Sequence, residues 1–82
     1  MLHRYWITVL QSSSPSPLNL GVGVTASSEA DARAIFMDTI DDKTISEIRL
    51  IQDMRSIDQK HVAPNMGNSA VRGIWFPMGY SK

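Results

Sequence analysis

A single stretch of this sequence has the period of a helix that buries one face. Ser27 or Ser28 can cap its first turn, and apolar residues then recur three and four positions apart. Asp31, three residues after Ser28, suits the positive end of the helix dipole. We expect the helix to end at 41–43, with Met37 on its outer side. The residues expected on the buried face are Ala32, Ile35, Phe36, Thr39 and Ile40.

Four short runs of aromatic, β-branched and other apolar residues flank this helix and predict strands. They cover residues 5–10, 20–26, 45–52 and 71–76. Gly21 and Gly23 share one face of the second run, which predicts either a bulge or another group lying close against the backbone. A helical turn is expected at 56–61, and the serine- and proline-rich segment 11–19 predicts a flexible loop.

The order of these elements predicts an α+β fold of ββαββ type in a single domain, residues 1–82, with one helix packed on one face of a mixed or antiparallel sheet. The helix joins the second and third strands as a crossover, so these two should run parallel to each other. The first strand is the most apolar, and we expect it between them, antiparallel to both. The fourth strand is expected beyond the third, which gives the strand order 2-1-3-4.

The composition limits the classes of function. The 82 residues are 43% hydrophobic and carry a formal net charge of zero, whereas nucleic-acid binders usually show a basic excess. The chain has no cysteine, which excludes disulfides and thiolate chemistry and favours a reducing cytoplasm. No apolar run reaches the length of a membrane span. We therefore expect neither a membrane nor a nucleic-acid partner, and no cofactor.

Three patterns resemble chemical motifs, and each has a simpler interpretation. The spacing from Gly21 to Ala26 matches part of a dinucleotide fingerprint, but it lies inside a strand of a chain too short for that fold. Asp58 and His61 could belong to a catalytic triad, although a local pair that holds a loop is favoured. No spacing supports a metal site. The aromatic residues suggest a stacking platform, yet core or dimer-interface roles fit a neutral chain better.

The irregular segment after the third strand contains the candidate binding residues. Pro64 favours an extended residue before it, and asparagine and glycine follow, which is typical of an irregular loop. Arg72 could clamp the carbonyls of this loop or pair with Asp58. The competing interpretation is that these residues only hold the loop in shape. The predicted binding residues are His61, Asn65, Met66, Arg72 and Trp75.

The C-terminal half resembles a widespread group of short bacterial proteins that have no assigned activity. The resemblance lies in the run 61–67, with His-Val before Pro-Asn-Met-Gly, and in the run 72–77, Arg-Gly-Ile-Trp-Phe-Pro. An opening such as Arg4-Tyr5-Trp6 and a middle such as 21–26 are shared as well. Genes of this kind often belong to the mobile part of bacterial genomes, so the resemblance supplies no activity of its own but favours an adaptor, an inhibitor or an immunity protein.

The leading hypothesis is therefore a small non-enzymatic protein–protein interaction module. Its partner would be another protein or a second copy of the chain in a homodimer. The alternative is a domain that binds a small ligand, or nucleic acid weakly, through the aromatic residues. An enzyme ranks third, because the sequence shows no convergent catalytic set.

Overall fold

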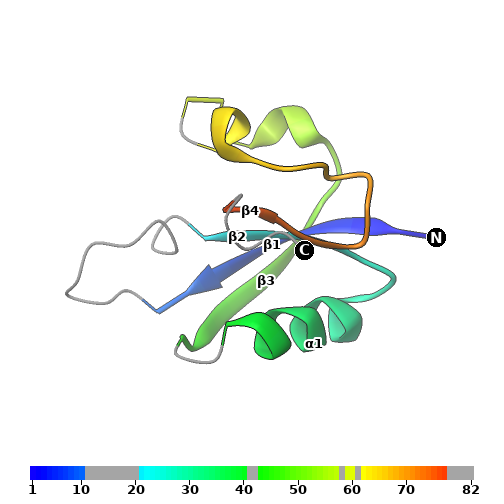
Figure 1. Ribbon diagram of the computed structural model, residues 1–82, viewed down its shortest axis with the longest axis vertical. Helices are drawn as coiled ribbons and strands as arrows, with labels where there is room; N and C mark the ends of the chain where they lie inside the picture. The colour runs from blue at the N-terminus through cyan, green and yellow to red at the C-terminus, as the bar shows by residue number, and fades with distance from the viewer. Residues whose placement is uncertain (11–20, 41–42, 58, 61, 78–82) are drawn as a thin grey trace.

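The computed structural model describes residues 1–10, 21–40, 43–57, 59–60 and 62–77, and the predicted loop at 11–19 lies outside this part. One helix packs on one side of a four-stranded sheet, and two short 3-10 helices lie on the other side (Figure 1). The α+β class and the ββαββ order are confirmed. In chain order the elements are β1 (His3–Val9), β2 (Val22–Ala26), α1 (Glu29–Thr39), β3 (Ile45–Ile51), η2 (Met54–Ser56), η3 (Ala63–Asn65) and β4 (Gly73–Phe76).

Helix α1 begins where its cap predicts. The hydroxyl of Ser28 accepts the backbone N–H of Asp31 at 3.0 Å, which satisfies one of the free donors of the first turn. At the other end, the N–H of Ile40 donates to the carbonyl of Phe36 at 2.7 Å. The last helical residue is Thr39, so the helix ends earlier than the predicted boundary at 41–43.

The sheet has the order β3-β1-β2-β4, and every neighbouring pair is antiparallel. The predicted place of β1 between β2 and β3 is confirmed. The predicted place of β4 beyond β3 is wrong, because β4 pairs with β2 at the opposite edge. The chain reaches that edge by crossing the face that α1 leaves open, with η2 and η3 on the way (Figure 1). A 3-10 turn lies at Met54–Ser56, just before the helical turn expected at 56–61, and positions 58 and 61 of that expected turn lie outside the described residues.

The helix side of the sheet holds the larger core. Ala32 and Phe36 are fully buried and Ile35 is partly buried, while Met37 is 53% exposed, so the predicted helix face is confirmed. A buried phenylalanine and its aliphatic neighbours supply the apolar burial that stabilises so small a domain. The sheet residues of this core are Tyr5, Ile7, Val9, Val22, Val24, Ala26 and Ile74.

The opposite face carries a second cluster built on Trp75 and Phe76, which are 1% and 2% exposed. The pairing of β2 with β4 shifts between Gly23 and Val24, so β4 has one extra residue and both rings reach the same face. Three atoms of the Trp75 indole lie only 2.5 to 2.6 Å from the position that a β-carbon on Gly23 would take. Trp6 occupies the same position over Gly21, whose φ is +119°. Both outcomes expected from the two glycines, a bulge and a close approach, are therefore found.

Hydrogen bonds anchor the crossing segment to the sheet. The hydroxyl of Thr25, a fully buried residue of β2, donates to the carbonyl of Ser69 at 2.6 Å. The guanidinium Nε of Arg4 on β1 donates to the same carbonyl at 3.2 Å. The N–H of Gly67 donates to the carbonyl of Trp75. These bonds connect the segment between β3 and β4 to three strands and so restrict the position of β4 in the sheet.

Candidate functional site

The structure separates the residues predicted to form one binding site. Met66 packs against the second cluster beside Trp75, so these two do lie together. Trp75 is a core residue, with its ring against Gly23. Arg72 lies away from them and pairs with the helix. His61 and the side chain of Asn65 lie outside the described residues, so the proposed loop site stays a prediction.

Arg72 forms a two-pronged ion pair with Asp31. Its Nε and Nη2 donate to the two carboxylate oxygens at 3.0 and 2.6 Å. This is the planar fork geometry that arginine offers to a carboxylate. The pair joins the first turn of α1 to the residue just before β4. Among the described residues the partner of Arg72 is Asp31 and not a loop carbonyl, and the other partner suggested by the sequence, Asp58, lies outside the described residues.

Asp31 also receives hydrogen bonds from its own end of the helix. The N–H and the hydroxyl of Ser27 donate to its Oδ2 at 2.9 and 3.1 Å. The hydrogen bonds from Arg72, followed by those from Ser27, hold the pKa of Asp31 well below its usual range because they stabilise the charged form. The same pairing raises the pKa of Arg72. This carboxylate is therefore ionised at neutral pH and acts as a fixed connection between helix and sheet.

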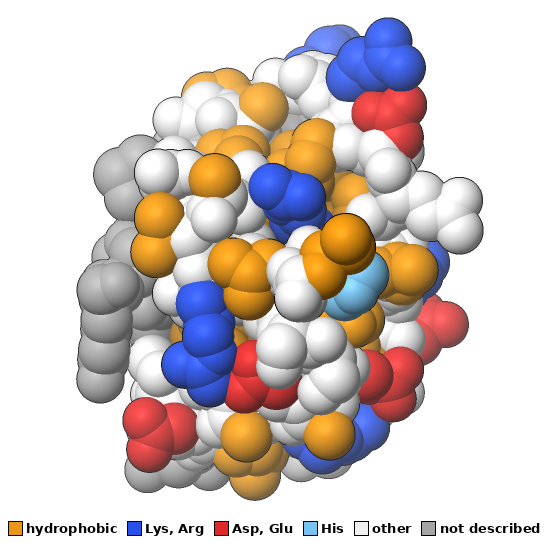
Figure 2. Space-filling view, turned by 90° about the vertical axis from the view of Figure 1, so that its right-hand side faces the viewer, with side chains coloured by type: hydrophobic (Ala, Val, Ile, Leu, Met, Phe, Trp, Pro, Cys, Tyr) orange, Lys and Arg blue, Asp and Glu red, His pale blue; other side chains and the backbone are white. Residues whose placement is uncertain are grey.

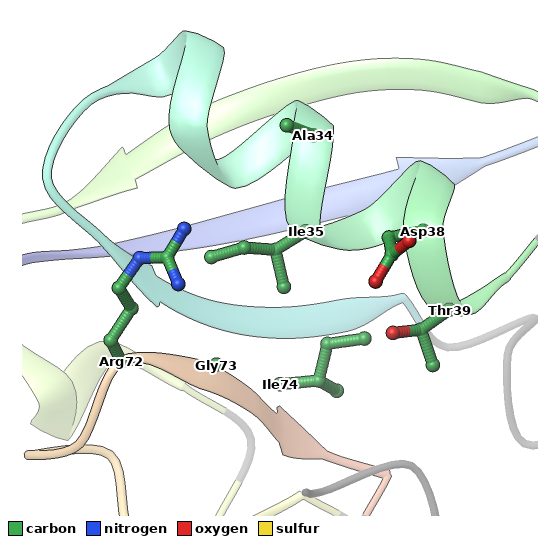
Figure 3. Close-up of a pocket in the computed structure, with 7 residues that line it drawn as sticks. All are labelled: Ala34, Ile35, Asp38, Thr39, Arg72, Gly73 and Ile74. Carbon is green, nitrogen blue, oxygen red and sulfur yellow. The ribbon is translucent and has the colours of Figure 1, made fainter.

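A groove of about 450 Å³ runs beside this ion pair between α1 and β4 (Figure 3). Ile35 from the helix and Ile74 from the strand extend into it from opposite sides (Figure 3). Arg72 lies at one end, and Asp38 and Thr39 lie at the other. The full set of lining residues is Ala34, Ile35, Asp38, Thr39, Arg72, Gly73 and Ile74.

The spacing of charge along the groove follows from the helix. Asp31, which holds Arg72, and Asp38 are two helical turns apart, or about 10 Å along the axis. The Arg72 side chain keeps 57% of its surface exposed although it is paired. The groove thus has a cation at one end, a carboxylate at the other and aliphatic side chains between them. It therefore offers contacts of opposite charge at its two ends and apolar contacts between them.

The aromatic residues do not form an open platform in the described part of the chain. Trp6 stacks on Phe76 with ring centroids 5.6 Å apart and lies 6.2 Å from the Trp75 ring. Of these rings only that of Trp6 is partly exposed. The buried Nε1–H of Trp75 has no hydrogen-bond partner among the described residues. The rings therefore pack against one another, as in a core, rather than offering free faces to bases.

The remaining charged groups of the described residues are scattered or paired locally. No three histidine, cysteine or carboxylate side chains there gather as a metal ion would require. Asp53 and Arg55 form an exposed local pair that caps η2, and such surface pairs contribute little to stability. The face in Figure 2 mixes small hydrophobic groups with charges of both signs. No helix in the described ranges has both the length and the apolar character needed to cross a bilayer.

Sequence reasoning missed most of the groove. Ile35 and Thr39 were expected only as core residues, and Asp31 only as a helix-cap carboxylate. The local signal for Asp31, its spacing from Ser28, is visible in the sequence, but Arg72 is 41 residues away and no pattern connects the two. Asp38 is visible only as one of several helix charges.

Comparisons of the chain with known protein families, with curated proteins and with solved structures give no match. The resemblance to short bacterial proteins therefore stays a prediction.

Proposed function

We propose that this chain is a non-enzymatic protein-binding module that takes an extended segment of a partner protein in the groove between α1 and β4. The groove supports this function because its aliphatic floor lies between a cation and a carboxylate. An adaptor, inhibitor or immunity-type protein, as the resemblance implies, would use a surface of this kind.

The groove defines the chemistry of the segment that fits it. A partner carboxylate would meet Arg72, and a partner lysine or arginine would meet Asp38. Asp31, which holds Arg72, and Asp38 are about 10 Å apart along the helix. A chain in the polyproline II conformation advances about 3.1 Å per residue and returns every third side chain to the same side, so the two charges of the segment should be three residues apart. An aliphatic side chain between them would pack on Ile35 and Ile74. The preferred segment is thus acidic, then aliphatic, then basic.

An extended segment fits this site better than a compact small molecule does. Sites for small ligands usually enclose most of the ligand surface. This groove is open along one side of the helix, and its lining mixes backbone, charged and aliphatic groups. Arg72 is already oriented by Asp31, so binding costs little side-chain ordering at that end.

Selection from a displayed library of random peptides tests the proposal. The expected result is enrichment of segments with an acidic and a basic residue three positions apart around an aliphatic residue. Ala34→Trp fills the groove from the exposed side of the helix and should weaken the best peptide at least about tenfold, a loss of about 1.4 kcal/mol. The matched control is Ala30→Trp, another exposed position of the helix that does not line the groove.

A charge reversal tests the polarity of the groove. Asp38→Lys should shift the selected residue at that end from basic to acidic and leave the other end unchanged. The proposal fails if the parent chain enriches no sequence class, or if Ala34→Trp and Ala30→Trp bind the selected peptides equally well.

A further inference from the structure

Strand β3 forms the edge of the sheet opposite to the groove. Its one neighbour is β1, and no described residue pairs with its outer side. Such an edge presents a row of backbone donors and acceptors that can pair with another strand. Glu47, Arg49 and Leu50 on this strand are exposed, and Ile48 is partly buried. The outer edge of β3 is therefore accessible along its regular part.

The charges on this edge are arranged symmetrically about Ile48. Glu47 precedes it and Arg49 follows it, so both project to the face of the sheet opposite to Ile48. Suppose that two antiparallel copies of the strand meet with Ile48 opposite Ile48. Each residue after Ile48 in one copy then faces the residue that lies equally far before Ile48 in the other copy. Glu47 of each copy then lies directly opposite Arg49 of the other. Such cross-strand pairs of opposite charge are stabilising, whereas like charges in the same positions are destabilising.

We propose that β3 pairs antiparallel with β3 of a second copy of this chain, centred on Ile48, to give a two-fold symmetric dimer with a continuous sheet. In an antiparallel ladder a two-fold axis can pass through a hydrogen-bonded pair of facing residues or through a non-hydrogen-bonded pair. The dimer can therefore form without any change in the pairing of β3 with β1. The β3 edge and the groove lie at opposite edges of the sheet, so the dimer leaves the groove accessible.

Apolar side chains near the β3 edge, on the face of the sheet that α1 covers, are also compatible with this dimer. Leu50 is 47% exposed and Met37 on the neighbouring flank of α1 is 53% exposed. In the dimer, Ile48 packs against its own equivalent, and Leu50 gains a neighbouring strand. The register shift between Thr8 and Val9 inserts an extra residue in β3 before Glu47. The regular pairing is therefore short, and the dimer is weak and depends on concentration.

The competing interpretation is that the same charges and the bulge protect the edge from pairing, as they do in many proteins. The two interpretations predict different average molecular masses for the protein at high concentration. Sedimentation equilibrium from about 10 μM to about 1 mM, the range of weak association, measures it directly. We expect the average mass to rise from the monomer value of 9.1 kDa towards twice that value, with a smaller rise at high salt.

Charge reversal supplies the decisive variants. Glu47→Arg alone places arginine opposite arginine, and Arg49→Glu alone places glutamate opposite glutamate. Each variant should raise the dimer Kd at least about tenfold. Mixing the two variants in equal amounts restores opposite charges at both positions, as does the double substitution Glu47→Arg with Arg49→Glu. Both should return to within about threefold of the parent Kd.

Two controls separate the possible causes of failure. Both positions are exposed, so far-UV circular dichroism melts should show each variant folded like the parent. Ala34→Trp in the groove should leave the dimer Kd unchanged. The proposal is overturned if the parent stays a monomer at about 1 mM, if the single reversals dimerise as well as the parent, or if the mixture and the double variant fail to recover.

Discussion

Gly23→Ala provides the most direct test of the packing between the sheet and the second cluster. An added β-carbon would lie 2.5 to 2.6 Å from three ring atoms of Trp75, about 1 Å inside ordinary contact. The Trp75 ring is 1% exposed and packed against Trp6, so it has no open space to move into. Overpacking of this kind costs typically about 1–3 kcal/mol, and a rigid buried ring favours the upper end.

We therefore expect Gly23→Ala to lower the free energy of unfolding by about 3 kcal/mol. For a domain of this size that corresponds to a fall in Tm of roughly 12–24 °C. Urea unfolding followed by far-UV circular dichroism measures the change without depending on the tryptophan signal. Adding Trp75→Phe removes the ring atoms that clash and loses no hydrogen bond to a described residue. The double variant should therefore be more stable than the sum of the single losses predicts.

Gly73→Ala is the matched control for this cycle. Its β-carbon would meet no atom within 4 Å, but the φ of +133° strains any residue with a side chain. We expect backbone strain alone to lower the free energy of unfolding by about 1–3 kcal/mol. Trp75→Phe should not relieve this strain. If Gly23→Ala unfolds within about 0.5 kcal/mol of the parent, or if Trp75→Phe relieves both glycine variants equally, the inference that the ring excludes a β-carbon at Gly23 is refuted.

Three further outcomes are expected. Phe36→Ala, at a fully buried position, should cost about 3–5 kcal/mol, while Met37→Ala should stay within about 0.5 kcal/mol; urea melts in the reverse order would contradict the assigned helix face. Because the folded pKa of Asp31 is lowered, its contribution to stability is complete above the unfolded pKa of about 3.9 and is lost as pH falls below it. The gap in stability between the parent and Asp31→Asn should therefore close in acid melts, and a gap that stays constant down to about pH 2 would refute the role of this carboxylate. Fluorescence titration with a generic oligonucleotide at about 150 mM salt should show no submicromolar binding, since a neutral chain makes few phosphate contacts.

The sequence by itself determined the elements whose cause is local. The Ser28 cap and the apolar spacing up to Ile40 defined the start and the buried face of α1, because both depend on residues within one or two turns. The aromatic and β-branched run of β1, apolar on both faces, indicated a strand in the middle of the sheet, and β1 does lie between β2 and β3. The glycines of β2 indicated that some group lies close to the backbone.

Only the tertiary structure decided which groups meet across long separations. The sequence could not show that the rings over Gly21 and Gly23 are those of Trp6 and Trp75, because any aromatic side chain satisfies the same local pattern. It placed β4 at the wrong edge, because strand propensity contains no information about which edge a long irregular connection reaches. The ion pair between Arg72 and Asp31 could not be predicted for the same reason. It forms only because β4 lies beside β2 and α1, and the position of β4 is set by the packing of the whole second face.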